Sequence, residues 1–176
     1  MKGNDIMKAN TVCFSGHRPE KFPSSDENSD IIIRIKKDIY REIKKSIDQG
    51  FTTFITGCAR GVDIWAALMV IEQKHKNDNI KLISAIPYKE HGKSFKGKDK
   101  FLINNILLNS DEIIYVSESY SRDCMRLRNQ FMVDNSSKLI AVVSDYRSGT
   151  GQTIRYANKQ GLDTIIIDIN KALKTL

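Results

Sequence analysis

Short apolar runs alternate with longer amphipathic ones along almost the whole chain. Six of the short runs are rich in Ile and Val and are bounded by Gly, Pro, Ser, Asn or Asp, which is typical of β-strands. These predicted strands cover residues 11–15, 52–56, 81–86, 112–116, 139–144 and 164–168.

Between the predicted strands, apolar residues recur every three or four positions, which is the period of an amphipathic helix. The clearest pattern is the isoleucine series from Ile31 to Ile47, followed by Gly50 where a glycine that ends a helix belongs. Weaker patterns of the same kind cover residues 64–74, 100–108, 123–133 and 153–159. This alternation predicts an α/β fold, in which a doubly wound and mostly parallel sheet carries helices on both faces.

The two ends of the chain differ in character. Residues 1–10 are polar and mixed in charge, and we expect them to form an N-terminal arm. Residues 11–176 are enough to bury a core without disulfide or metal support, so a single domain is expected. Two long polar segments, residues 19–30 and 89–98, follow predicted strands. Ligands of doubly wound sheets bind outside the carboxyl ends of the strands, where these segments emerge.

Basic residues outnumber acidic ones, with 28 Lys and Arg against 21 Asp and Glu, and the formal net charge is +7. This balance suits an anionic partner, either a nucleic acid or a small nucleotide. Cys13, Cys58 and Cys124 are widely spaced and form no CxxC or Cys/His array, so neither a disulfide framework nor a metal site is expected. Reduced thiols indicate a cytoplasmic protein. No apolar run approaches the roughly 18 residues of a membrane span, so no membrane partner is expected.

The most informative segment is residues 57–63, Gly-Cys-Ala-Arg-Gly-Val-Asp, where a strand pattern breaks into a turn and then a helix. Glycines permit close approach, and the free N–H groups at a helix start attract anions, so the turn predicts a phosphate cradle. Its expected ligand-binding residues are Gly57, Cys58, Ala59, Arg60 and Gly61. Arg60 would add a planar, two-pronged donor, and Asp63 either caps the helix or binds a ribose hydroxyl. A plain strand-to-helix connection is the alternative for the whole turn.

Three other strand ends carry residues that belong to the same predicted rim. The first is dense in hydrogen-bond donors, and the last is a second turn of small and hydroxyl residues before a helix. The middle one is stiffened by a proline and carries a tyrosine that either stacks on a base or covers the sheet edge. Their candidate ligand-binding residues are Ser15, Gly16, His17 and Arg18; Pro87 and Tyr88; and Ser148, Gly149, Thr150 and Thr153. Together these ends indicate a ligand with phosphates or several hydroxyl groups.

Taken in order, these motifs resemble the YpsA-type branch of the SLOG superfamily over residues 11–168. The resemblance is carried by the Ser-Gly-His-Arg-Pro loop, residues 57–67, Pro87-Tyr88, residues 125–137 and residues 148–157. That superfamily includes the LOG phosphoribohydrolases and the DNA-processing protein DprA. The resemblance implies a Rossmann-like fold, a nucleotide-derived ligand, Arg128 as a ligand-binding residue, and a homo-oligomer.

The resemblance also bears on catalysis. LOG enzymes combine a Met-His-x-Arg-Lys segment with a Pro-Gly-Gly-x-Gly-Thr-x-x-Glu loop, whose arginine and glutamate act on the N-glycosidic bond. Arg128 matches the arginine position, but Arg155 and Tyr156 stand where the glutamate belongs. Because glycosidic cleavage commonly relies on a carboxylate, binding without turnover is favoured. The first alternative is a hydrolase with an atypical acid, with Arg128 and His17 as its candidate catalytic residues.

We therefore expect a binding protein for a small nucleotide, such as ADP-ribose or another NAD-derived signal, with no cofactor required. SLOG domains occur as sensors in antiphage systems, so the resemblance implies either a sensor or a phage-encoded sponge. The net charge supports a second alternative, a DprA-like binder of single-stranded nucleic acid. The basic residues are scattered, apart from the lysine-rich residues 93–100, which form either a plain flexible loop or a lid over an anionic ligand.

Overall fold

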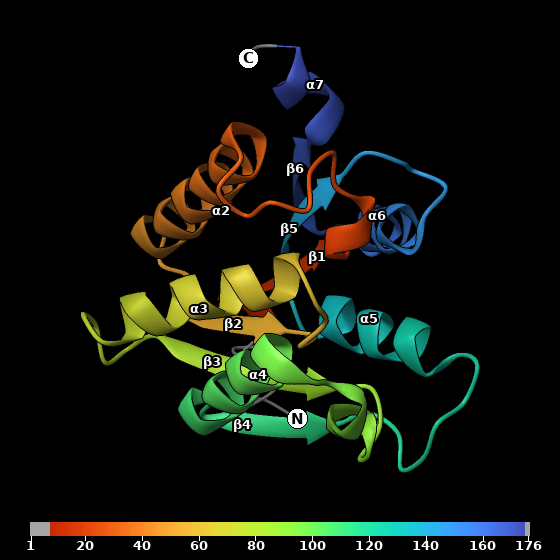
Figure 1. Cartoon of the computed structure of the whole chain (residues 1–176). Coiled ribbons are helices and arrows are strands. Elements are labelled where there is room, and N and C mark those ends of the chain that lie inside the picture. Colours follow the sequence, from red (N-terminus) through yellow and green to blue (C-terminus); the bar gives the residue numbers. More distant parts are fainter. Residues whose placement is uncertain (1–7, 175–176) are drawn as a thin grey trace.

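The computed structural model describes residues 8–174, and within them six parallel strands form one sheet (Figure 1). Their spatial order is β4-β3-β2-β1-β5-β6. The strands are β1 (Thr11–Gly16), β2 (Thr53–Thr56), β3 (Lys81–Ile86), β4 (Glu112–Tyr115), β5 (Lys138–Val143) and β6 (Asp163–Asp168). All six strands that the sequence predicts are confirmed, and each end agrees within one residue, because the apolar runs are the segments buried between layers.

Helices cover both faces of the sheet, as the sequence predicts (Figure 1). The helices are α2 (Asp30–Asp48), α3 (Val62–Lys74), α4 (Gly97–Asn109), α5 (Cys124–Asp134), α6 (Gly149–Lys159) and α7 (Ile169–Leu173). On one face, α2, α3, α4 and α7 bury their apolar side chains together with Phe14 and Phe54 of the sheet. On the other face, α5 and α6 pack Met132 and Ile154 against Cys13 and Ile55. Alternate residues of one strand therefore serve two separate cores.

Helix ends differ from the sequence pattern where local capping decides them. Helix α6 begins at Gly149, ahead of the predicted residue 153, because the Ser148 hydroxyl accepts a hydrogen bond from Gly151 N at 3.3 Å. The short helix α7 is absent from the prediction, and it is started by Asp168, whose carboxylate accepts from Asn170 N at 2.9 Å. Gly50 has φ of +91° just after α2, which confirms its predicted place at the helix end.

The two segments predicted as long polar loops each contain one short 3₁₀ helix, η1 (Pro19–Lys21) and η2 (His91–Ser94). The lysine-rich residues 93–100 contribute to η2 and to the first turn of α4. Phe95 packs against the core, and Lys93 and Lys98 form ion pairs with Glu90 and Glu27. The expectation of a plain loop is therefore wrong for this segment, since an apolar anchor and two ion pairs hold it.

The sheet changes winding direction at β1. This strand lies between β2 and β5, and the chain leaves β1 toward α2 on one face but leaves β5 toward α6 on the other. The connections after neighbouring strands thus diverge and leave a crevice at the carboxyl ends of β1 and β5, the place where open α/β sheets bind ligands.

Two kinds of feature, a membrane-spanning helix and a metal-binding cluster of side chains, are absent from residues 8–174. None of the helices within residues 8–174 has the length and apolar character needed to cross a bilayer. Over the same residues, His, Cys, Asp and Glu side chains form no cluster of three or more that could hold a metal ion. Most of the predicted N-terminal arm, residues 1–7, lies outside the described residues, whereas Asn10 O accepts from Thr52 N and Thr53 N at 3.1 Å each.

Candidate functional site

A cavity of about 430 Å³, here called the central cavity, occupies the crevice at the carboxyl ends of β1 and β5. It brings together ten of the residues that the sequence singles out: Ser15, Gly16, His17, Arg18, Ala59, Asp63, Arg128, Ser148, Gly149 and Thr150. They come from the end of β1 and the loop after it, the turn that leads into α3 and the first turn of α3, helix α5, and the N-cap and first residues of α6. Four segments far apart in the sequence thus form a single wall.

The turn at residues 57–63 is closed by its own carboxylate. Asp63 is 5% exposed, and its Oδ2 accepts from Ala59 N at 3.3 Å. Burial raises the pKa of Asp63, while Arg128 and the N–H groups of Ala59 and Gly57 act in the opposite direction. Gly61, rather than Asp63, stands at the N-cap of α3. Asp63 therefore caps the turn and not the helix, and it occupies donors that the sequence assigned to a phosphate.

The two glycines of this turn make close approaches to protein groups. A Cβ on Gly57 would lie 2.6 Å from Asp63 Oδ2 and would overlap the Arg128 guanidinium. A Cβ on Gly61, whose φ is +88°, would lie 2.5 Å from the carbonyl oxygen of His17. These glycines thus bring the turn against α5 and against the loop after β1, so they shape the cavity from behind.

Arg128 connects the two glycine-containing turns through hydrogen bonds. The residue is 5% exposed, its Nη1 donates to Gly57 O, and the same atom lies 3.6 Å from Asp63 Oδ2. Its Nε donates to Asn129 Oδ1 at 2.8 Å, and Asn129 Nδ2 donates to Thr153 Oγ1 at 3.0 Å. Most of the positive charge of Arg128 is therefore balanced by Asp63, and the guanidinium holds the wall in place.

His17 fastens the loop after β1 to the loop after β5. Its side chain is 5% exposed, and Nε2 accepts a hydrogen bond from Ser144 N at 2.9 Å. An acceptor Nε2 places the ring proton of the neutral imidazole on Nδ1. Burial lowers the pKa of His17, Asp145 opposes this shift, and Lys21 adds to it. The candidate catalytic histidine is thus held neutral in a hydrogen bond that spans the crevice.

We expect His17→Gln to flatten the pH dependence of stability. The pKa of His17 is lowered in the folded protein from 6.5, so the unfolded chain binds the proton first as the pH falls. The contribution of His17 to the free energy of unfolding is therefore largest above pH 6.5 and decreases as the pH falls below 6.5. Urea unfolding at pH 7.5 and 5.5 should show a larger loss for the wild type than for the variant. An equal loss in both, with exposed His75→Gln as the control, would contradict the assignment.

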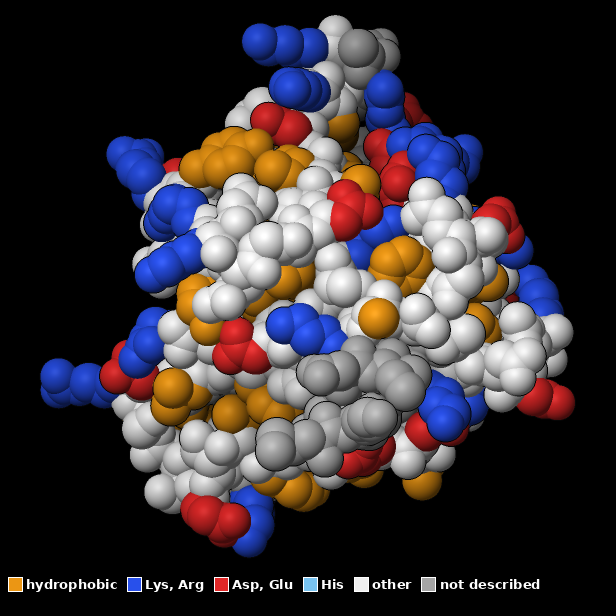
Figure 2. Space-filling view, turned by 180° about the vertical axis from the view of Figure 1, so that it is seen from behind, with side chains coloured by type: hydrophobic (Ala, Val, Ile, Leu, Met, Phe, Trp, Pro, Cys, Tyr) orange, Lys and Arg blue, Asp and Glu red, His pale blue; other side chains and the backbone are white. Residues whose placement is uncertain are grey.

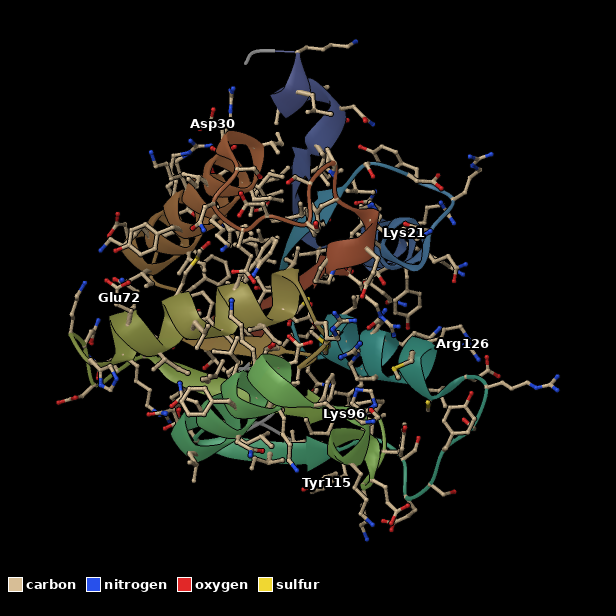
Figure 3. The ribbon with its side chains drawn as sticks, in the orientation of Figure 1. Lys21, Asp30, Glu72, Lys96, Tyr115 and Arg126 are labelled. Carbon is tan, nitrogen blue, oxygen red and sulfur yellow. The ribbon has the colours of Figure 1, made fainter. Side chains whose placement is uncertain are left out.

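The central cavity is lined by two cations that have no partner within the part of the chain that the structure describes. Three basic and two acidic side chains line it, and the acids are engaged, because Asp63 faces Arg128 and Glu20 faces Arg60. Arg18 and Lys21 are exposed, and neither side chain forms a hydrogen bond or ion pair with another residue of 8–174. In Figure 3, Lys21 lies on the same side of the molecule as Arg126, away from Glu72 at the far end of α3. The cavity therefore favours an anion.

The start of α6 adds backbone donors to these cations. Gly149 and Thr150 are its first two residues and line the cavity, while Gly151 N is already bound by the Ser148 hydroxyl. The first N–H groups of a helix have no acceptor within the helix, and the helix dipole makes this end positive. The start of α6, more than the turn at residues 57–63, therefore offers the backbone N–H donors that bind a phosphate.

The remaining predicted site residues lie outside the wall of the central cavity. Arg60 donates through Nε to Asp99 at 2.6 Å and through Nη1 to Glu20, so its guanidinium is engaged by two carboxylates. Cys58 points into the core, where Sγ lies 3.3 Å from Ser84 Oγ. Tyr88 lines a neighbouring cavity of about 250 Å³, and Thr153 lines one of about 450 Å³ between α5 and α6. Gly57 and Gly61 lie behind the wall of the central cavity, and Pro87 is buried.

Sequence reasoning did not select several residues of the wall. Met125 and Asn129 lie within the segment that carries the family resemblance. Met125 is three residues before Arg128 and four before Asn129, so both of those residues lie on the same side of α5 as Met125. That spacing was a usable signal. No local pattern points to Lys21, which reaches the cavity only because η1 folds back over the end of β1.

The residues at the position of the LOG glutamate make contacts that lead away from the central cavity. Arg155 Nη1 donates to Tyr146 O at 2.7 Å, and Tyr156 Oη donates to Asp134 Oδ1 at 2.8 Å. Of the described acids, only Glu20 and Asp63 line the central cavity, and both are in ion pairs. No carboxylate of residues 8–174 stands free there to stabilise an oxocarbenium ion.

Basic side chains do not form one continuous surface on the face shown in Figure 2. Lys and Arg lie in separate groups, many at its outline and some near its middle, with Asp and Glu beside several of them. Two lysines that have a lysine as their neighbour in the sequence are neutralised by carboxylates, since Lys36 forms an ion pair with Glu27 and Lys45 forms one with Glu42. A nucleic acid binds best to a stripe of unpaired cations, so the distribution on this face and these ion pairs give little support to a polymer ligand.

The chain is similar in sequence to one protein family and to several bacterial proteins. A family model described as the YspA SLOG family (YpsA) matches residues 12–171. The uncharacterized SPbeta prophage-derived protein YoqJ of Bacillus subtilis strain 168 is 36% identical over 118 residues, which cover 60% of this chain and 69% of that protein. A UPF0398 protein of Bacillus cereus strain B4264 is 24% identical over 153 residues, covering 85% of this chain and 83% of that protein.

A solved structure of similar fold is the X-ray structure of DNA processing protein A (DprA) from Streptococcus pneumoniae. It superposes with a TM-score of 0.63 at 20% sequence identity over 92% of this chain. The match spans 51% of the DprA chain, so this chain corresponds to about half of that protein. At this identity the likeness establishes the Rossmann-like α/β fold alone.

Proposed function

Because this chain belongs to the YspA SLOG family, we propose that its central cavity binds a small nucleotide-derived ligand through the ligand's phosphate. One observation carries the proposal: Arg18 and Lys21, whose side chains have no partner among the described residues, line the same cavity as the first residues of α6. Two cations and a helix N-terminus recognise a phosphate by charge and by N–H donation. The position at the switch point of the sheet supports the same reading.

Binding without turnover is the form of the proposal that the chemistry favours. Cleavage of an N-glycosidic bond needs a group that stabilises positive charge on the sugar. In the described cavity both acids are engaged by arginines, and His17 is held neutral by Ser144 N. Arg128 is itself engaged by Gly57 and Asp63, so it acts as a positioning residue.

A ligand held intact suits a sensor or a sponge for a nucleotide signal such as ADP-ribose. One relative, YoqJ, is described as prophage-derived, which fits a phage-encoded sponge. A sponge needs slow release and a stable complex, whereas a sensor needs a partner that responds to the bound state. Dissociation rates therefore distinguish the two roles once a ligand is known.

Calorimetry against ADP-ribose, cyclic ADP-ribose, NAD, AMP and a single-stranded oligonucleotide tests the proposal, with chromatography of the recovered ligand. We expect binding of at least one nucleotide and its recovery unchanged. Release of free base or ribose by the wild type would establish a hydrolase instead. Tight oligonucleotide binding with a steep salt dependence would establish a nucleic-acid binder.

We expect Arg18→Met to weaken binding of the phosphate-bearing ligand about 10- to 100-fold, as loss of a charge-assisted hydrogen bond does. Lys37→Met is the matched control, because Lys37 is an exposed lysine on α2 outside the cavity. Arg60→Met should weaken binding less than Arg18→Met, since Glu20 and Asp99 already engage Arg60. Equal affinities for the wild type and Arg18→Met would contradict the phosphate assignment.

A further inference from the structure

A smaller cavity of about 250 Å³, here called the side cavity, adjoins the central cavity. Arg18, Ala59 and Met125 line both, so the two spaces meet along these three residues. The other residues of the side cavity are Arg60, Tyr88, His91, Ser94 and Phe95. Its volume is below that of a typical site for a whole small-molecule ligand and suits one part of a larger one.

The side cavity contains a polar group whose hydrogen bonding is incomplete. His91 is 7% exposed, and its Nδ1 is buried with no hydrogen-bond partner among residues 8–174. A buried and unpaired nitrogen destabilises the folded protein unless something else satisfies it. The χ2 torsion of histidine is roughly two-fold, so a half-turn of the ring brings Nδ1 to its opposite edge without moving the backbone.

Aromatic rings surround this imidazole. Tyr88 and Phe95 each lie with ring centroids 5.2 Å from His91 in edge-to-face geometry, at 71° and 89°. Burial, together with the nearby charges of Arg128 and Arg18, lowers the pKa of His91 to about 4. The imidazole is therefore neutral near pH 7, with one nitrogen that donates and one that accepts.

The charges of the side cavity differ from those of the central one. Arg60 is engaged by Glu20 and Asp99, and Arg18 stands at the boundary between the two spaces. Aromatic faces and a neutral imidazole suit an uncharged, planar ring that carries hydrogen-bonding nitrogen or oxygen atoms. A phosphate in the central cavity and such a ring in the side cavity are the two ends of a nucleotide.

We propose that the side cavity is the nucleobase subsite of the ligand, and that His91 makes the hydrogen bond that selects the base. The inference rests on the proposed function, because it needs the phosphate in the central cavity. It adds His91 to the ligand-binding residues and places the ligand along the rim, with its phosphate at α6 and its base near η2. It also assigns the selectivity for the base to His91. Arg18 lies between the two ends, where it contacts the ribose or the phosphate linked to it.

Calorimetry with ribose 5-phosphate and the four nucleoside 5′-monophosphates tests the subsite. The wild type should bind its preferred monophosphate at least 10-fold more tightly than ribose 5-phosphate. His91→Phe should reduce this ratio by about 10-fold while leaving the affinity for ribose 5-phosphate unchanged, since one hydrogen bond to the base is lost. His91→Asn, which keeps a polar nitrogen near Nδ1, should recover part of the ratio.

Further measurements distinguish a failure of the base subsite from a failure of the phosphate site. A shift of the His91 ring ¹⁵N resonances on addition of the preferred monophosphate, absent with ribose 5-phosphate, would support direct contact. Equal wild-type affinities for all five compounds would overturn the base subsite and leave the phosphate site standing. An unchanged ratio in His91→Phe, or a ratio reduced equally by exposed His75→Phe, would also overturn it. A wild type that binds none of the five would overturn the proposed function and this inference together.

Discussion

Arg128→Met is expected to lower the free energy of unfolding by about 3–5 kcal/mol at neutral pH, because the substitution leaves the buried Asp63 without its counter-charge. Methionine keeps much of the arginine stem, so the loss is mainly electrostatic. Gly57 O also loses its donor. Chemical denaturation measures the change, and ligand affinity should fall as well, because Arg128 holds the turn before α3 against α5.

The pH dependence of this variant distinguishes a lost charge from a lost contact. Without Arg128, the pKa of Asp63 rises further above its ordinary value, and the folded state binds a proton more readily than the unfolded one. The destabilisation should therefore shrink as the pH falls from 8 to 5. Arg126→Met, two residues along α5 with its ion pair to Asp123 exposed, is the control and should change stability little. A loss independent of pH would contradict the role of Asp63.

Gly61→Ala is expected to cost about 3 kcal/mol of stability and to abolish measurable ligand binding. Two effects combine, since φ of +88° is unfavourable for alanine and its Cβ would lie 2.5 Å from the carbonyl oxygen of His17. The backbone of the loop after β1 must move to make room. That movement displaces His17 and Arg18, which line the central cavity.

Gly50→Ala provides a matched control for this substitution. Gly50 has φ of +91° after α2, and a Cβ there meets no atom within 4 Å. The control thus carries the dihedral strain without the collision, and it should cost about 1 kcal/mol and leave binding intact. Thermal and urea unfolding of both variants isolate the steric contribution. Equal losses for the two glycines would show that the contact between the turn and the loop is loose.

The positions of the chemistry-bearing residues along the sheet could be predicted from sequence. Apolar runs at a period of two or in short blocks define strands, and the alternation with helices requires parallel strands whose carboxyl ends meet at one rim. Ser15, Gly149 and Asp63 lie at three such ends, and the structure brings them to one cavity. This inference holds because it uses the order of elements and needs no detail of any loop.

The partners of those residues could not be predicted in the same way. Arg60 has the same local signal as a phosphate ligand whether or not Asp99, which is 39 positions away, accepts from it. Arg128 contacts Gly57 across 71 positions, and the choice of Gly57 O and Asp63 depends on how α5 packs against the turn. The sequence predicts close approach at the glycines of residues 57–63, and the structure confirms it, but the groups that approach are His17 at Gly61 and Arg128 at Gly57.

The sequence by itself determined the six strands, the helices that separate them, the family, and the rim at which we propose that a ligand binds, because hydrophobic period and motif order are local properties of the chain. Only the tertiary structure decided which cations are free. Within residues 8–174, the side chains of Lys21 and Arg18 form no hydrogen bond or ion pair, whereas Arg60 and Arg128 are each paired with at least one carboxylate. The reason is physical: an ion pair depends on a few ångströms between residues remote in sequence, and loop geometry sets that distance.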